Sequence, residues 1–127
     1  MRRAFFLVLC LVLGLPLIAS AQKNVQPAPA GQAVFYQDYQ CTTGNSIALG
    51  MGSYADLRSY SMESGGNWND QISCMTIGDG IKKVTVYQDI NFKGKSKEFK
   101  KTANNPLGCW SLAKDWWNDR ISSIKIE

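Results

Sequence analysis

Short stretches of alternating apolar and polar residues recur through most of this chain. Near residue 85, Val84 and Val86 fall on one side of the alternation, and near the C-terminus Ile124 and Ile126 do the same. A period of two residues is typical of a β-strand with one buried face. Turn-forming residues interrupt the alternation about every ten residues, which predicts an all-β fold, a sandwich or a barrel. The internal repeat described below, taken as two units of four strands, gives about eight strands.

A lysine-rich stretch, residues 93–100, also alternates and is predicted to be a strand. Lys93, Lys95 and Lys97 fall on one face, which we interpret as the solvent face, where lysines protect an edge from pairing with other chains. A patch for anionic surfaces is the alternative. Residues 111–117 are expected to form one helical turn.

The long apolar run lies at the N-terminus. Arg2 and Arg3 precede an apolar stretch over residues 5–18, and small residues follow at 19–21. This order predicts a secretory signal peptide over residues 1–21. The run is short for a membrane span, and a retained anchor is the alternative. The mature protein is therefore expected to be secreted or periplasmic, without a membrane span.

Composition changes abruptly after the apolar run. Residues 22–32 are polar and rich in Pro, Ala and Gly, which predicts a flexible lead-in, and residues 33–127 suffice for one small domain. Without Arg2 and Arg3 the basic residues number 12 against 10 acidic ones. A net charge of +2 gives no support to a nucleic-acid partner.

The residue types present restrict the chemistry. The chain has no histidine, which excludes Ser-His-Asp and Cys-His catalysis and the usual zinc sites. No pair of its scattered acids forms a catalytic frame, so we do not expect an enzyme.

Export to an oxidising compartment favours a disulfide. Cys10 lies in the predicted signal peptide and is expected to be removed with it. The remaining Cys41, Cys74 and Cys109 allow three pairings, of which Cys41–Cys74 is favoured because both lie in the first half. Cys109 is then a buried small residue or a dimerising thiol.

The domain repeats itself once. The stretch VFYQDY at residues 34–39 returns as TVYQDI at 85–90, and WNDQIS at 68–73 returns as WNDRIS at 117–122. Two landmarks in the same order at offsets of 51 and 49 indicate duplication of one unit. The turn signal GDG at 78–80 separates motif 1, about 33–78, from motif 2, about 81–127.

The repeat resembles the Greek-key motif of the βγ-crystallin family. Motif 2 carries the family's aromatic strand, hairpin and glycine, from Tyr87 to Gly94, and its closing Asn-Asp-X-X-Ser-Ser signature over residues 118–123. Motif 1 departs from the pattern. Its glycine comes one residue later, Cys74 replaces the final serine, and Cys41 stands where motif 2 has Phe92. The resemblance implies two Greek-key motifs that form one eight-stranded β-sandwich.

The resemblance also implies two calcium sites, each built by both motifs. In such a site the third signature residue offers its carbonyl, the fifth its hydroxyl, and the aspartate comes from the other motif. The first site would then use the Gln71 carbonyl, Ser73 and Asp119, and the second the Arg120 carbonyl, Ser122 and Asp70. A further carbonyl would come from Gln37 or Asp38 and from Gln88 or Asp89, and Asn69 and Asn118 would support the loops.

Calcium accepts such mixed oxygens, and one carboxylate per site predicts an affinity on the order of micromolar to millimolar. The plain structural alternative is that Asn-Asp before a strand is ordinary turn chemistry, in which the side chains bond to the backbone nearby.

Three functions are consistent with these features. The first is a secreted calcium-binding module with a structural, adhesive or binding role. The second is a secreted proteinase inhibitor that presents residues 101–110 as a rigid loop, braced by Cys109 if that residue is bonded. The third is a glycan-binding protein that uses Trp110 and Trp116, if these are exposed. Trp68 and Trp117 recur at equivalent positions and are expected to be packed inside.

Overall fold

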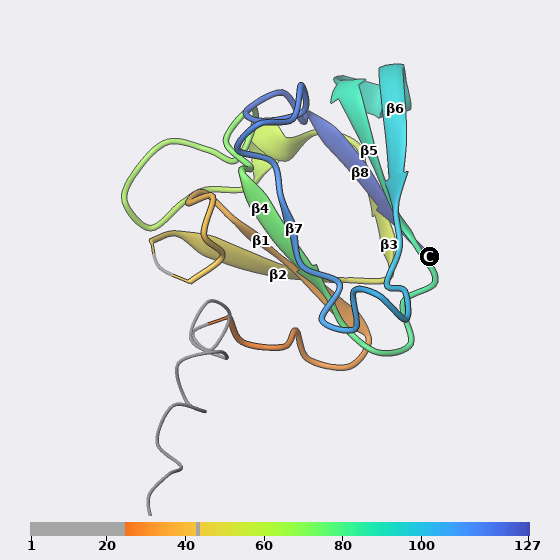
Figure 1. Cartoon of the computed structure of the whole chain (residues 1–127). Helices are drawn as coiled ribbons and strands as arrows, with labels where there is room; N and C mark the ends of the chain where they lie inside the picture. The colour runs from red at the N-terminus through yellow and green to blue at the C-terminus, as the bar shows by residue number, and fades with distance from the viewer. Residues whose placement is uncertain (1–24, 43) are drawn as a thin grey trace, which may run out of the picture.

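The computed structural model describes residues 25–42 and 44–127, so the predicted signal peptide lies outside the described residues. Two four-stranded sheets lie opposite each other (Figure 1). The first has the order β2-β1-β4-β7, and the second has the order β3-β8-β5-β6. Every recorded pairing between these strands is antiparallel. The expected all-β, two-motif sandwich is confirmed.

Each motif gives three strands to one sheet and one strand to the other. From motif 1, β1 (Gln32–Tyr36), β2 (Ser46–Gly50) and β4 (Cys74–Ile77) form the first sheet, while β3 (Gly52–Tyr54) crosses to the second. From motif 2, β5 (Val84–Asp89), β6 (Lys93–Phe99) and β8 (Ser123–Ile126) form the second sheet, while β7 (Trp110–Ser111) crosses to the first. This exchange means that neither motif completes a sheet alone.

The core lies between the sheets and follows the alternation of the strands. Phe35 and Met75 of the first sheet are fully buried, as are Val86 and Ile124 of the second. The two repeated tryptophans belong to this core, where Trp68 is 1% and Trp117 6% exposed. Their expected packing role is confirmed. Burying a large aromatic side chain contributes on the order of 2–3 kcal/mol.

The lysines of β6 are exposed to solvent, and β6 is an edge strand, as the sequence predicted. The pairing adds one detail. Lys97 lies opposite Val86 in the ladder, and directly paired residues point to the same face, so Lys97 lies on the side of the sheet that carries the core. It stays exposed because the core ends before it. Lys97 bonds to Asp115 at 3.0 Å. Charges turned inward at an edge are a known protection against edge pairing.

The expected helical turn at residues 111–117 is absent, and two successive turns take its place. Asp115 N–H donates to the Leu112 carbonyl, and Asn118 N–H donates to the Asp115 carbonyl. The Asp115 carboxylate accepts from the Trp117 N–H at 3.0 Å. An aspartate side chain that bonds to the backbone two residues on competes with helix formation.

The hairpin loops of the two motifs are anchored by different contacts at equivalent positions. Phe92 and Cys41 hold equivalent positions and both have left-handed backbones, with φ of 61° and 58°. Phe92 packs edge-on against Tyr87, with ring centroids 5.5 Å apart. Cys41 instead forms a disulfide with Cys74, with a Cα–Cα distance of 5.4 Å. Each loop is therefore anchored to its own sheet, by an aromatic contact in motif 2 and a covalent bond in motif 1.

Candidate metal centre

The two signature loops cross at one end of the sandwich, each bonding to the other motif. Asp70 N–H donates to the Ile121 carbonyl at 3.0 Å, and Asp119 N–H donates to the Ile72 carbonyl at 3.1 Å. These two bonds are equivalent under the repeat. Because they run between loops 49 residues apart in sequence, they place the aspartate of each motif beside the serine of the other.

Both aspartates have left-handed backbones, with φ of 59° at Asp70 and 56° at Asp119. This conformation costs roughly 1–2 kcal/mol for most residues, and Asp and Asn adopt it more readily because their short side chains bond locally. The repeated Asn-Asp dipeptide thus has a backbone reason. The same turn leaves the carboxylates at the start of the next strand.

The first cluster contains Asp119, Ser73 and Gln71. Ser73 Oγ donates to Asp119 Oδ1 at 3.1 Å. The Gln71 side-chain oxygen accepts from Gln37 Nε2 at 3.0 Å, so this side chain is tied to the hairpin of its own motif. Ser73 is 6% exposed. The structure therefore brings together the three residues that the sequence assigned to the first site.

The second cluster contains Asp70, Ser122 and Arg120. Ser122 Oγ lies 3.4 Å from Asp70 Oδ1. A hollow of about 370 Å³ opens over this cluster, and its walls are formed by Asp70, Gln88, Asp89, Asp119, Arg120 and Ser122. The Asp70 carboxylate and the Ser122 hydroxyl offer oxygens that suit a hard cation. Asp89 and Asp119, the acid of the first cluster, add negative charge to the walls, and Arg120 adds one positive charge. The structure also brings these assigned residues together.

The hairpin residues expected to add a carbonyl stay as two pairs. The Asp89 carbonyl accepts from Ser123 Oγ at 2.6 Å, and the Asp38 carbonyl accepts from the Cys41 N–H at 3.4 Å. Each carbonyl keeps a second lone pair, and Gln88 and Asp89 both line the hollow of the second cluster.

The supporting asparagines carry unpaired oxygens. Asn69 Oδ1 and Asn118 Oδ1 are buried and have no hydrogen-bond donor within the described part of the chain. Asn118 Nδ2 lies 3.4 Å from Asp119 Oδ2 and helps to orient that carboxylate. Buried acceptors without a donor are uncommon in folded proteins. Oxygens without a donor beside both aspartates are consistent with cation sites, so the residues present fit calcium.

Arg120, which lines the hollow of the second cluster, and Lys95 both lie over Trp116. The Arg120 guanidinium carbon lies 4.6 Å from the Trp116 ring centroid, and Lys95 Nζ lies 4.5 Å from it. Trp116 is 39% exposed and stands edge-on against the buried Trp117. The equivalent of Arg120 in motif 1 is the neutral Gln71. The two clusters thus differ in charge although their acidic and hydroxyl groups match.

Asp115, which lies in the turn that carries Trp116, has a carboxyl group with a lowered pKa. The Trp117 N–H that donates to Asp115, helped by Lys97, holds the pKa of the Asp115 carboxyl below its usual value. Asp115 therefore stays charged to lower pH than an ordinary aspartate, and its bond to the Trp117 N–H is lost only when the pH falls through this lowered pKa.

The glycan and inhibitor hypotheses depend on two other features. Trp110 is half-buried against Phe99, with ring centroids 5.6 Å apart, whereas Trp116 is exposed. Cys109 is a free thiol, so it does not brace residues 101–110 through a disulfide. That loop is instead held internally by Asn105, whose side chain bonds to both the N–H and the carbonyl of Cys109.

Sequence reasoning missed the Gln37–Gln71 contact and the cations on Trp116. The first had a signal, because Gln37 and Gln88 recur at equivalent positions in the repeat. The second had none, because Lys95 lies 21 residues before Trp116 and meets it only through the turn at residues 112–118.

Paired Greek-key motifs with crossed signature loops define the class of protein, and comparison with known structures agrees. A βγ-crystallin domain from Flavobacterium johnsoniae is 33% identical, with a TM-score of 0.56, over 75% of this chain and 92% of that one. A structure described under the evolution of the eye lens βγ-crystallin domain fold is 26% identical, with a TM-score of 0.62, over 81% and 92% of the two chains.

A βγ-crystallin domain from Clostridium beijerinckii is also 26% identical, with a TM-score of 0.53, over 75% of this chain and 95% of that one. No family model and no curated protein sequence matches the chain. The identity and coverage shared with the Flavobacterium domain show that the chain belongs to the βγ-crystallin family.

Proposed function

We propose that this protein is a secreted calcium-binding βγ-crystallin module with a structural, adhesive or binding role. The observation that carries the proposal is the reciprocal contact of the two loops. Ser73 meets Asp119, and Ser122 meets Asp70, so each motif supplies the acid for the other motif's hydroxyl. An ion bound there joins the two motifs and adds to the stability of the folded chain.

Equivalent residues would serve as ligands at the two sites. At the first, the Gln71 carbonyl, the Ser73 hydroxyl and the Asp119 carboxylate would hold the ion. At the second, the Arg120 carbonyl, the Ser122 hydroxyl and the Asp70 carboxylate would do so. Calcium would supply a positive charge that holds the crossed loops together. With few carboxylates per ion, the expected affinity is that of an extracellular module.

The family supports a binding or structural role. The relatives above are βγ-crystallin domains, and one further structure, 25% identical with a TM-score of 0.53, is a clostrillin double mutant in complex with nickel. Export rests on residues 1–21, which lie outside the described residues. In the described part of the chain, no helix has the length and apolar character to cross a membrane.

The decisive experiment measures thermal unfolding with calcium and with chelator. A ligand at 100 times its dissociation constant adds about 2.7 kcal/mol per site. For a domain near 100 residues this corresponds to a rise in Tm of roughly ten degrees or more. Asp70→Asn and Asp119→Asn should each remove about half of the rise, because each deletes one carboxylate while leaving a residue suited to a left-handed backbone.

Asp79→Asn is the matched control, since Asp79 lies at an exposed turn and pairs with Lys101. It should leave the calcium-dependent rise unchanged. An unchanged Tm on adding calcium to the wild type would show that the repeated signature is turn architecture only.

Neither alternative function gains a specific observation. A sugar stacking on Trp116 would compete with Lys95 and Arg120, which already lie over that ring. An inhibitory loop at residues 101–110 lacks the covalent brace that Cys109 was expected to provide.

A further inference from the structure

Three sulfur atoms meet at one place on the first sheet. The Sγ atoms of Cys41, Cys74 and Cys109 all lie within 4.8 Å of one another, although the residues are 33 and 35 positions apart along the chain. Cys41 and Cys74 are bonded to each other, and Cys109 carries a free, half-buried thiol. A free thiol is thus held in contact range of a disulfide.

The fold itself builds this cluster from three elements. Cys74 begins β4, between β1 and β7, and Cys109 immediately precedes β7. Cys41 lies in the loop after β1, and Ser111 Oγ of β7 donates to the Tyr39 carbonyl of that loop at 2.8 Å. The loop that carries Cys41 is therefore docked on the strand that follows Cys109.

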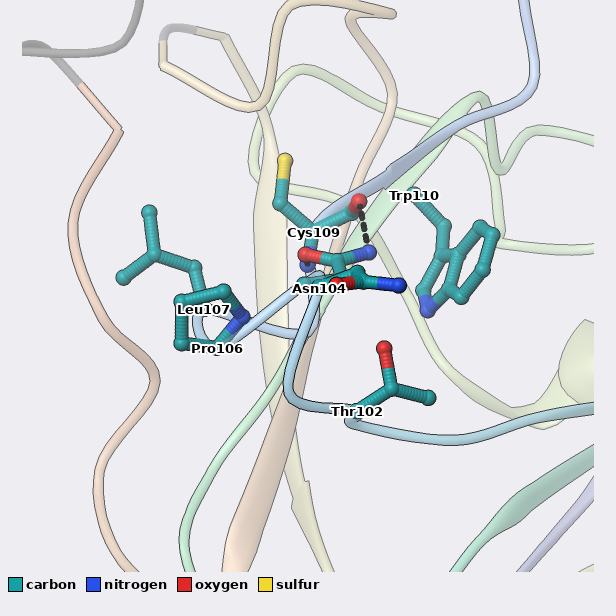
Figure 2. Close-up of a pocket in the computed structure, with 7 residues that line it drawn as sticks. Thr102, Asn104, Pro106, Leu107, Cys109 and Trp110 are labelled. Carbon is teal, nitrogen blue, oxygen red and sulfur yellow. Dashed lines mark hydrogen bonds between the residues drawn. The ribbon is translucent and has the colours of Figure 1, made fainter.

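The backbone that carries the thiol is fixed by one side chain. The Asn105 side chain accepts from the Cys109 N–H at 3.1 Å and donates to its carbonyl at 2.9 Å. In Figure 2 the Cys109 sulfur points away from the Trp110 ring. The residues lining the neighbouring hollow of about 420 Å³ are uncharged, so no ion pair holds the sulfur there.

A metal site does not account for the cluster as it stands. Metal binding needs thiolates, and two of the three sulfurs are already joined to each other. The chemistry that this arrangement allows without any added reagent is exchange between a thiol and a disulfide.

We propose that Cys109 is an exchange thiol that takes over the disulfide from Cys74. The Cys109 thiolate attacks Cys41 Sγ, a bond forms between Cys109 and Cys41, and the bond between Cys41 and Cys74 breaks. Its electron pair goes to Cys74 Sγ, which takes up one proton to replace the proton that Cys109 gave to solvent. The number of disulfides is unchanged, so no oxidant or reductant is needed.

Attack at Cys41 is favoured over attack at Cys74 by the backbone. Cys41 and Cys109 both lie in turns outside the strands, whereas Cys74 is paired with Tyr36 on one side and Ser111 on the other. A disulfide requires Cα atoms about 4.4–6.8 Å apart, and turns adjust to this more easily than a central strand. The released Cys74 is 1% exposed and fits its site as a small apolar residue.

The exchange changes which parts of the molecule are tied together. The Cys41–Cys74 bond lies within motif 1, whereas a Cys41–Cys109 bond joins motif 1 to motif 2. The protein thus has two covalent forms with the same composition. Burial raises the pKa of the Cys109 thiol, so the reactive thiolate is scarce at neutral pH and the two forms interconvert slowly.

The test follows the position of the free thiol. The wild-type protein is kept at mildly alkaline pH without oxygen, quenched in acid, alkylated and digested with trypsin without reduction. Arg58, Lys83 and Lys101 separate the three cysteines into different peptides. We expect the label to lie on Cys109 at first and to appear on Cys74 with time, together with a Cys41–Cys109 linked peptide. The experiment uses the mature protein from residue 22 onward, which lacks Cys10, and its Cys109→Ser variant should show no label on any cysteine.

Two further variants test the proposal even if the equilibrium between the two disulfide forms leaves little Cys41–Cys109 form in the wild type. In Cys74→Ser, under a glutathione redox buffer, Cys41 and Cys109 should form an intramolecular disulfide. In Cys41→Ser, Cys74 and Cys109 should stay largely as thiols. Label confined to Cys109 in the wild type, together with two free thiols or a linked dimer in Cys74→Ser, would overturn the proposal. Label on Cys41 would overturn the assigned direction of attack. If Cys74→Ser does not fold, the wild-type time course decides alone.

Discussion

At the scale of single residues, the two candidate sites are equal in their acids and unequal in their surroundings. Asp70 and Asp119 share a left-handed backbone and a serine partner from the other motif. Arg120 then places a positive charge on the wall of the second cluster, where the equivalent residue of motif 1 is the neutral Gln71. Like charges lower the affinity for a cation by an amount that depends on distance and salt.

This asymmetry predicts that Arg120→Gln strengthens the second site. The change copies the residue found at the equivalent position of motif 1 and keeps the backbone carbonyl in place. For charges near the surface, we expect a gain of about 0.5–1 kcal/mol, a few-fold in calcium affinity. Isothermal titration calorimetry at low salt measures it.

Gln71→Arg is the reciprocal control and should weaken the first site by a similar factor. Equal affinities in the wild type, unchanged by both substitutions, would show that side chains at the third signature position do not influence the ion.

At the scale of elements, the hairpin of motif 2 depends on one glycine. Gly94 has φ of 77°, and a Cβ there would lie 2.6 Å from Asp89 Oδ2 and 3.2 Å from Gln88 Cβ. Both neighbours line the hollow of the second cluster. The glycine of this motif is therefore required by backbone conformation and by close contact with the candidate site.

Gly94→Ala should lower the free energy of unfolding by about 2–3 kcal/mol, the sum of a left-handed backbone cost and a steric clash. It should also reduce calcium binding at the second site, because Asp89 must move. Urea unfolding monitored by tryptophan fluorescence measures the first effect.

Gly80→Ala is the matched control. Its φ is 89°, and a Cβ there would meet nothing within 4 Å, so it carries the backbone cost alone. Equal losses for the two variants would contradict the steric contribution at Gly94.

At the scale of the whole molecule, stability comes from joining two motifs that share their sheets. The core is continuous across both, and the single disulfide found among the described residues closes a stretch of 33 residues in motif 1. Closing a loop of that length lowers the conformational entropy of the unfolded chain, which stabilises the folded protein by about 3–4 kcal/mol.

Reducing agent should therefore lower the unfolding free energy by roughly 3 kcal/mol. The measurement is urea unfolding of Cys109→Ser with and without reductant, since this background prevents exchange of the disulfide. Calcium should restore part of the loss in the reduced protein, because the ions join the motifs independently of the sulfurs. If the reductant leaves the free energy of unfolding unchanged, the disulfide does not contribute to stability and the prediction is wrong.

Much of this architecture was predictable from sequence, because its determinants are local. A period of two in Val84 and Val86 identifies a strand that is half buried, and the repeated Asn-Asp identifies a tight turn at a fixed place in each unit. The duplication itself then supplied the number of strands. Trp68 and Trp117 followed from their equivalence in the repeat.

Other features depend on neighbours that the local pattern does not reveal. Lys97 is exposed as predicted, but which face of the sheet it lies on is set by its pairing with Val86. Residues 111–117 have helical composition, and Asp115 redirects them by bonding to the Trp117 backbone.

What the sequence determined by itself is the repeating unit, with its strands, its turns and the residue types placed at each turn. Only the tertiary structure decided which units meet. It exchanged β3 and β7 between the sheets, set Asp70 beside Ser122 and Asp119 beside Ser73, and brought Cys109 to the disulfide. Local patterns depend on backbone preferences a few residues long, whereas these contacts exist because burying both apolar faces forces the two motifs together.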